Sequence, residues 1–468
     1  MPPGLGGKSL VTIRVLCIAA DSTERPGRPV RVPPRHDGCH KPESSPGSSP
    51  DERDTMPTAV ARGTILPFAV WLLTRTALLL FVFKVVVFPG PDVTSDVSAI
   101  YRGWYEVLST GTYPMNDVTW QYPPAGALAI LSPGLLPGLD YTSAFFVVVL
   151  VCDLAVLLLL RYAERGGTAR RGTWMWVVGV PLLGPTVYAR YDLMVTAVAV
   201  AALLAGLRRP RTLGALAGFG AVLKVWPVLL LLGVPRGRTT VRSWGAAAAT
   251  GGAVTLLLCT LMPGGLAFLT FQRDRGTEVE SLGALVFHIA RHFGWEGQVL
   301  LNYGSVEFLG PYVPLVSTIA LGLSVLALGW LVLWRLRARE FGPSTPCDAA
   351  FAAVLLFTTT SRVISPQYMV WLVGLAAVCL VFRDSRMTLP AWLALAATAV
   401  TVLEFPIWFA EVVASDPSGI ALLVLRNGLL VAATVTACRR LWRQTVAVPQ
   451  PPARVSPAAR EDSHATSR

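Results

Sequence analysis

Charged residues are scarce in this chain: they make up 15% of its 468 residues, while 53% are hydrophobic. A chain of this length and composition is too apolar for a soluble domain, and its apolar residues come in long blocks. These blocks lack the alternation of apolar and polar residues that a membrane β-barrel needs. Because only helices and closed barrels satisfy the backbone in lipid, we expect an all-α polytopic membrane protein.

Metal-binding patterns are lacking as well. The seven cysteines are scattered, and no pair has the spacing of a metal site. His288 and His292 stand four residues apart, but two ligands do not make a zinc site. We therefore expect no metal and no disulfide framework.

The net charge of +12 raises the possibility of a nucleic-acid partner. Most of the basic residues, however, lie in the tails and in short clusters between apolar blocks. Those are the positions of the orientation signals of membrane proteins. We expect membrane lipids as the surroundings and no nucleic acid.

The two ends of the chain differ in composition from its centre. Residues 1–56 are rich in Pro, Ser and Arg and cannot bury a core. We expect a disordered tail there, or a start assigned too early, because Met56 stands just before the first long apolar block. Residues 57–443 form the predicted transmembrane domain, and 444–468 a disordered cytoplasmic tail.

Basic clusters between the apolar blocks predict the topology. The first span should cover about residues 64–88. Further blocks fall near 124–139, 141–160, 173–189, 192–207, 212–233, 244–262, 311–334, 347–360, 364–382, 388–410 and 419–438. The clusters at 161–171, 208–211, 235–242, 334–339, 382–386 and 438–443 should all be cytoplasmic. This arrangement works with about ten spans and two cytoplasmic termini, provided that two blocks do not cross. Those are 124–139, expected to be juxtamembrane or re-entrant, and 212–233, broken at "KVWP".

With this topology the unusual polar residues gather on the extracytoplasmic side. Asp96 follows the first span, with Tyr101 one turn later, and Tyr122 opens "YPP". A carboxylate beside aromatic rings at a membrane boundary suits a general base, and the rings suit a sugar. The alternatives are a helix N-cap for Asp96 and an interfacial aromatic belt.

Cationic residues at the same side predict an anion site. Lys224 stands inside an apolar run, where an ammonium must pair, reach water or meet an anion. Arg190 and Asp192 form a close pair of opposite charges in "YARYD". The further candidates are Arg275 and Glu280 in "FQRDRGTEVESL", and Arg362 and Gln367 in "SRVISPQY".

Six stretches together resemble glycosyltransferase family 87: "SDVSAIYRGWY", "TWQYPP", "ARYDLMVTAVAVAALL", "AVLKVWPVLLL", "FQRDRGTEVESL" and "VISPQYMVWLV", in that order. The resemblance implies a C-type glycosyltransferase (GT-C) fold with extracytoplasmic re-entrant or juxtamembrane helices, and residues 57–443 as its catalytic domain. It also implies a polyprenol-phosphate sugar donor, commonly carrying mannose, and a lipid or glycan acceptor. No cofactor is implied, and the active site is expected on the extracytoplasmic side of the plasma membrane.

The resemblance implies roles for individual residues too. Asp96 matches the position of the catalytic base, and Asp92 and Asp117 are its rivals. Lys224, Arg190, Arg275 and Arg362 would meet the donor phosphate. Two other classes stay open: a transporter or flippase for a lipid-linked or anionic substrate, and a non-catalytic membrane assembly protein.

Overall fold

The computed structural model describes residues 56–166, 170–206, 208–271 and 276–446. The expected tails therefore lie almost wholly outside the described residues. At the carboxyl end the last helix runs to Thr445, two residues past the predicted domain boundary.

Six of the described helices are long and apolar enough to cross a membrane. They are α1 (Met56–Val82), α4 (Tyr141–Ala163), α8 (Arg238–Leu261), α11 (Val313–Arg337), α14 (Thr388–Val402) with the π-turn η7 (Leu403–Ile407), and α16 (Pro417–Thr445). Four shorter apolar segments accompany them: α3 (Gly126–Leu131) with η3 (Ser132–Leu135), α6 (Asp192–Gly206), α12 (Thr345–Thr360) and α13 (Tyr368–Val381). A polytopic membrane protein is confirmed to this extent, and the number of spans stays a prediction.

The first span ends earlier than expected. α1 ends at Val82 and not at residue 88, and Lys84 has φ +58°, in the left-handed region. The segment that follows is irregular until a π-turn, η2 (Asp96–Tyr101), continues directly into α2 (Arg102–Ser109).

The predicted break at "KVWP" is confirmed. α7 (Pro210–Leu223) ends before Lys224, whose backbone is extended (φ −157°, ψ 133°), and the 3-10 turn η6 (Trp226–Leu231) follows. Pro227 lacks an N–H and cannot continue the α7 ladder. A second apolar block, 173–189, is divided into α5 (Arg171–Gly179) and η5 (Pro181–Val187).

The expectation of an all-α protein needs one correction. The loop between α8 and α11 holds a small antiparallel sheet in the order β1–β3–β2, with β1 (Thr277–Glu278), β2 (Gln298–Asn302) and β3 (Ser305–Leu309). Leu300 pairs with Glu307 in the β2–β3 hairpin. In the chain, α9 (Phe268–Phe271) precedes the sheet, and α10 (Ala284–Arg291) comes between β1 and β2. An apolar cluster around Phe287 and Phe308, separate from the main core, packs α10 against the sheet. Strands of two to five residues are too short to stand out in a sequence that is divided by its long apolar blocks.

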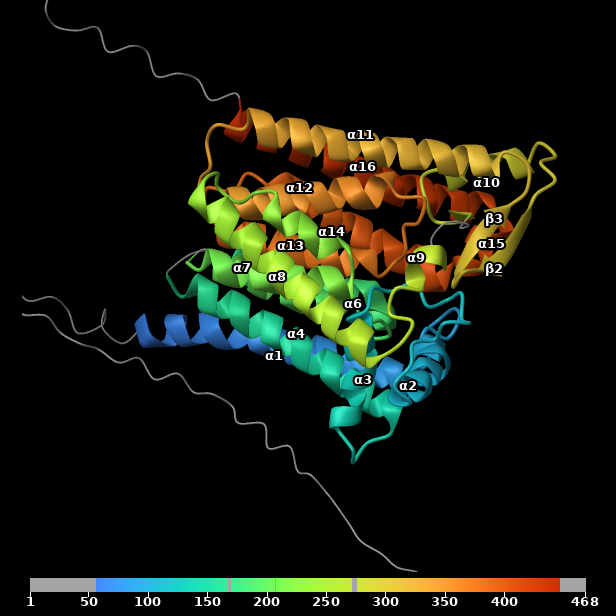
Figure 1. Ribbon diagram of the computed structural model, residues 1–468, viewed down its shortest axis with the longest axis horizontal. Helices are drawn as coiled ribbons and strands as arrows, with labels where there is room; N and C mark the ends of the chain where they lie inside the picture. Colours follow the sequence, from blue (N-terminus) through green and yellow to red (C-terminus); the bar gives the residue numbers. More distant parts are fainter. Residues whose placement is uncertain (1–55, 167–169, 207, 272–275, 447–468) are drawn as a thin grey trace, which may run out of the picture. The chain divides into compact units, whose positions relative to one another are not determined.

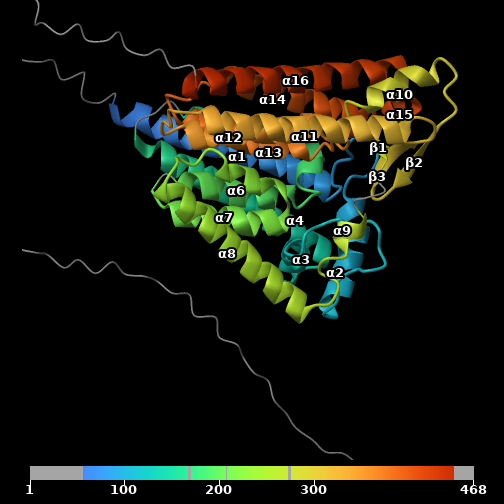
Figure 2. The same ribbon diagram turned by 45° about the horizontal axis from the view of Figure 1, so that its top comes forward.

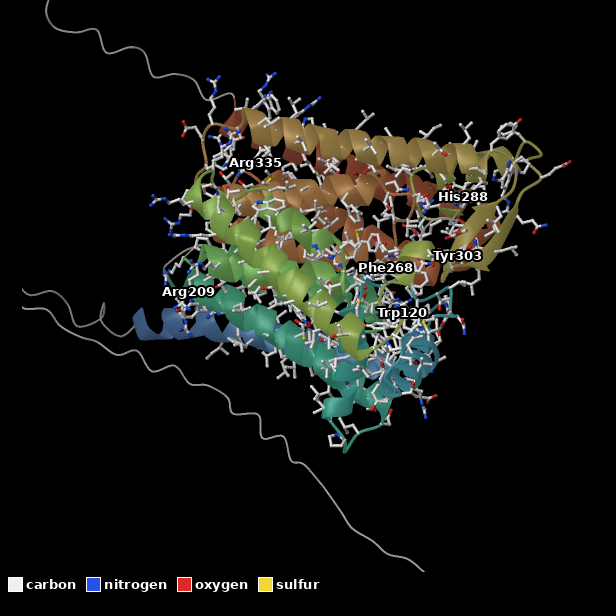
Figure 3. All side chains as sticks on the ribbon, viewed as in Figure 1. Trp120, Arg209, Phe268, His288, Tyr303 and Arg335 are labelled. Carbon is white, nitrogen blue, oxygen red and sulfur yellow. The ribbon has the colours of Figure 1, made fainter. Side chains whose placement is uncertain are left out.

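These connecting elements gather at one end of the long helices (Figures 1 and 2). α2, α3, α9, α10, the sheet and α15 (Phe409–Ala414) all lie at that end. Figure 3 places Arg209 and Arg335 at the opposite end from Phe268 and Tyr303. The fold therefore separates a basic end from an end built of loops and short elements.

Candidate active site

A cavity of about 450 Å³ opens at the loop end of the helices. Its walls come from six parts of the chain: η2 and α2, the loop before α3, the α7–η6 break, α9, the β2–β3 turn, and the connection between α12 and α13 with the adjoining ends of those helices. The cavity is lined by six of the residues singled out in the sequence, namely Asp96, Tyr101, Tyr122, Lys224, Arg362 and Gln367. The fold thus brings together groups that are up to 271 positions apart in the chain.

Asp96 stands at the start of η2 and is held by Arg190. Arg190 Nη2 lies 2.6 Å from Asp96 Oδ2, and the Asp96 side chain is 32% exposed. Arg190 Nη1 donates to the backbone oxygens of Ala189 and Val93, at 2.8 and 3.3 Å. The residue before η2 makes no side-chain capping bond, and Asp96 takes part in an ion pair instead of a cap. Its carboxylate is thus oriented by Arg190 and open to the cavity.

Lys224 pairs with Asp192 beneath the cavity. Lys224 Nζ lies 2.7 Å from Asp192 Oδ1, and the same oxygen accepts a hydrogen bond from Trp371 Nε1 at 2.8 Å. The Asp192 side chain is 2% exposed and that of Lys224 14%. A buried charge is tolerated only with such partners. Asp192 therefore anchors the lysine and does not itself line the cavity.

Four aromatic rings surround the ammonium group of Lys224. Nζ lies 5.1–5.7 Å from the ring centroids of Trp371, Tyr191, Tyr122 and Tyr368. Ring faces attract cations, and more strongly where water is excluded. Lys224 lies in the break between α7 and η6, outside the apolar helices. Burial lowers the pKa of its ammonium group, and the Asp192 carboxylate opposes part of that shift.

Tyr101 and Tyr122 form an aromatic wall near Asp96. Tyr101 stacks on Trp104 with the ring centroids 5.4 Å apart, and Tyr122 meets Tyr191 edge-on at 5.0 Å. Burial raises the pKa of Tyr122 to about 12, and the negative charge of Asp192 adds to the shift. Tyr122 therefore stays a neutral phenol at any physiological pH.

Arg362 and Gln367 enter the cavity on the connection between α12 and α13, and Glu278 fixes this connection. Glu278 accepts hydrogen bonds from Ile364 N at 2.6 Å and from Ser365 Oγ at 2.8 Å. Its own N–H donates to the Arg362 carbonyl oxygen at 3.1 Å. Glu278 stands two residues before Glu280 in the same stretch, and its carboxylate holds this loop.

Glu280 lies outside the cavity. Its carboxylate faces Arg426, 146 positions further along the chain, with Nη2 3.7 Å from Glu280 Oε1. Arg426 also pairs with Glu404 through Nε and Nη2. The geometry gives no support to the expected substrate role of Glu280. Arg275, another expected phosphate ligand, lies outside the described residues.

The two rival carboxylates are engaged elsewhere. Asp92 lies 2.7 Å from Lys84 Nζ, accepts two hydrogen bonds from Thr94, and does not line this cavity. Asp117 accepts from Trp104 Nε1 at 2.7 Å and from Thr119. Partial burial opposes the ionisation of both groups, but their hydrogen bonds outweigh it and lower the pKa of each carboxyl. A carboxylate with a lowered pKa is a weaker base than an ordinary one.

Sequence reasoning did not single out the ring stack beside Lys224. Trp226 stacks on Trp371 at 5.3 Å, and Trp371 stacks on Tyr368 at 4.0 Å; all three line the cavity. The available signals were the Tyr–x–x–Trp spacing of residues 368 and 371 and the position of Trp226 two residues after Lys224. Both read equally well as core packing.

No group of three or more metal-ligating side chains occurs among the described residues. His288 instead donates through Nε2 to the Val279 carbonyl at 2.8 Å, and its Nδ1 faces Ser415 Oγ at 2.8 Å. His292 contacts the Ser415 carbonyl oxygen at 2.8 Å. Both histidines thus connect α10 to the α15 region through hydrogen bonds.

Comparison with known protein families identifies a match. The family model of glycosyltransferase family 87 matches residues 120–366, more than half of the chain. The matched range contains Tyr122, Arg190, Lys224 and Arg362, while Asp96 precedes it. No curated protein and no solved structure matches the chain significantly.

Proposed function

Because the chain belongs to glycosyltransferase family 87, we propose that it transfers a hexose, mannose in the first instance, from a polyprenol-phosphate donor to a lipid or glycan acceptor. The reaction takes place at the extracytoplasmic face of the plasma membrane and inverts the anomeric carbon. Asp96 is the base. The proposal needs no cofactor, and we expect activity in the presence of EDTA.

One observation carries the proposal: an oriented carboxylate and a buried ammonium line the same cavity. Asp96 supplies the carboxylate and Lys224 the ammonium, and Arg362 adds a second cationic residue to the lining. Direct displacement needs these two functions. The acceptor hydroxyl loses a proton while a phosphate leaves with negative charge.

The proposed reaction is a direct displacement at the anomeric carbon. Asp96 accepts the proton of the acceptor hydroxyl while that oxygen attacks the anomeric carbon. The bond between the anomeric carbon and the phosphate oxygen breaks, and its electron pair leaves with polyprenyl phosphate. Lys224 stabilises the charge that develops on the phosphate, and the aromatic rings of Tyr101 and Tyr122 pack against the sugar.

An apolar rim of the cavity supports a lipid-linked donor. Val225, Leu269 and Phe357 line the cavity and are 55%, 60% and 39% exposed. In a membrane protein such exposed apolar side chains can contact the lipid acyl chains. The prenyl chain of a bound donor can extend from the cavity into the lipid along these side chains while its phosphate stays near Lys224.

The distribution of basic residues supports an extracytoplasmic site. Arg209 and Arg335 belong to two of the basic clusters and lie at the end of the helices opposite Phe268 and Tyr303, which line the cavity (Figure 3). Basic clusters favour the cytoplasmic side. This orientation also puts the start of α1 and the end of α16 on the cytoplasmic side.

The test is a transfer assay with the full-length protein in lipid vesicles. Labelled polyprenol phosphate mannose and polyprenol phosphate glucose are compared as donors, with a lipid extract of the native membranes as acceptor. We expect label from the mannose donor in acceptor products and none with Asp96→Asn. Movement of intact donor between leaflets without any transfer would support the transporter and overturn the proposal.

A further inference from the structure

A second hollow of about 750 Å³ adjoins the active-site cavity. It lies between α2 and the loop 112–119. Ile100, Trp104 and Thr119 line both spaces, whereas Gly103 and Asn116 line only the second. These three shared residues form a wall between the two spaces, and a molecule bound in the second hollow lies next to the active-site cavity.

This shared wall is fixed in place. Trp104 Nε1 donates to Asp117 Oδ2 at 2.7 Å, and the Trp104 ring contacts Trp120 and Tyr122 edge-on at 5.2 and 5.7 Å. The loop on the far side is anchored by Tyr113, whose hydroxyl donates to the Pro124 carbonyl at 2.8 Å. The hollow is thus preformed by hydrogen bonds and ring contacts.

The residues of η2 and α2 that line this hollow lie on the same side of the helix as the proposed base. Asp96, Ile100, Gly103 and Val107 are spaced four, three and four residues apart, and the last three line the second hollow. Residues at this spacing share one helix face. Gly103 is seven residues from Asp96, roughly 10 Å along a helix, so a short oligosaccharide along this face would end at the carboxylate.

The chemistry of the two spaces differs. The residues lining the second hollow include no lysine and no arginine, and its charged member is the Asp117 carboxylate. Hydroxyl and amide groups come from Thr112, Thr119 and Asn116, and aromatic rings from Trp104 and Tyr113. Such a lining does not suit a phosphate. It suits a neutral sugar, which offers hydroxyls to polar groups and C–H faces to rings.

We infer that the second hollow binds the saccharide part of the acceptor and delivers its hydroxyl to Asp96. The inference rests on the proposed function, because it takes the first cavity as the donor site. Donor and acceptor then approach Asp96 from two sides of Trp104.

Two bulky substitutions test this division. A side chain at Gly103 enters open space, since a Cβ there meets no atom within 4 Å. Gly103→Trp therefore fills the second hollow, and Val225→Trp adds the same bulk to the donor cavity. Gly245→Trp is the matched control, because Gly245 is an open position on α8 that lines neither space.

The readout is the apparent KM for each substrate, with labelled polyprenol phosphate mannose as donor and the native lipid extract as acceptor. Gly103→Trp should raise the acceptor KM about tenfold or more, equivalent to about 1.4 kcal/mol of lost contact, with the donor KM unchanged. Val225→Trp should do the reverse, and Gly245→Trp should change neither.

A Gly103→Trp protein with an unchanged acceptor KM, or with an equal rise in the donor KM, would overturn the inference. Should that variant fail to fold, Val107→Trp fills the same hollow from a side chain that is already 38% exposed, and the same criteria apply. Absence of transfer by the unmodified protein with every polyprenol-phosphate donor is a different result, and it counts against the proposed function itself.

Discussion

Arg190 Nη2 and Asp96 Oδ2 are 2.6 Å apart and join two segments that are 94 positions apart in the chain. The guanidinium group also donates to the Val93 and Ala189 carbonyl oxygens, which fixes it beside Asp96. A carboxylate paired in this way keeps a defined orientation toward the acceptor. The guanidinium group beside Asp96 would also attract an incoming phosphate.

The first prediction concerns the base. Asp96→Asn should lower kcat about 10²–10⁴-fold, because an amide cannot accept the proton of the acceptor hydroxyl. Asp92→Asn is the matched control: it makes the same change four residues earlier, at a carboxylate outside the cavity. Transfer rates with labelled donor check both variants. Equal rates for Asp96→Asn and the unmodified protein would exclude Asp96 as the base.

The second prediction separates the two roles of Lys224. Lys224→Met should weaken donor binding and also destabilise the fold by about 3–5 kcal/mol, because it leaves Asp192 buried and unpaired. In the double variant Lys224→Met with Asp192→Asn, thermal unfolding should recover toward that of the unmodified protein, while the donor KM stays high.

Lys84→Met is the control for the loss of a lysine. Lys84 pairs with Asp92 at an exposed position, with side chains 61% and 47% exposed, and such pairs contribute about 0–1 kcal/mol. A double variant that regains a normal donor KM would show that Lys224 only supports the fold.

The third prediction concerns pH. Donor binding requires a charged Lys224, and burial lowers the pKa of this group below the 10.5 of an ordinary lysine. The donor KM should therefore begin to rise at a lower pH than an ordinary lysine would give. Lys224→Arg should move this rise to higher pH, because a guanidinium stays protonated. An unchanged alkaline limb in the arginine variant would assign the titration to another group.

The fourth prediction is about stability away from the cavity. The Asp153 carboxylate accepts hydrogen bonds from Trp71, Arg75, Trp176 and Tyr188 and is fully buried. Asp153→Ala leaves Arg75 buried without its partner and should cost about 3–5 kcal/mol. Asp140→Ala removes the exposed cap of the same helix and should cost about 1 kcal/mol. Thermal unfolding measures both, and equal losses would show that the Asp153 network adds little.

The two carboxylates Asp92 and Asp96 show how far sequence reasoning reached. Both follow the first span and both stand among small polar residues, so composition alone could not rank them. The structure pairs Asp92 with Lys84 outside the cavity and turns Asp96 into it. Asp92 lies in the irregular segment before η2, whereas Asp96 is the first residue of η2 and pairs with Arg190, a contact that no local pattern names.

The acids at 278 and 280 give the same lesson. Both stand in a stretch that resembles the family, and Glu280 had been expected near substrate. Glu278 holds the loop that carries Arg362, and Glu280 faces Arg426, which lies 146 positions away. The partner of a buried charge is a long-range contact, and nothing local in the sequence names it.

The sequence by itself determined the membrane helices, the break at Lys224 and the grouping of polar residues near the span ends. These follow from local rules: lipid requires a backbone that satisfies its own hydrogen bonds, and proline interrupts a helix. Only the tertiary structure decided that Lys224 pairs with Asp192, that four rings surround it, and that Asp96 shares its cavity. Those contacts join distant segments, and their geometry depends on how the helices pack against one another.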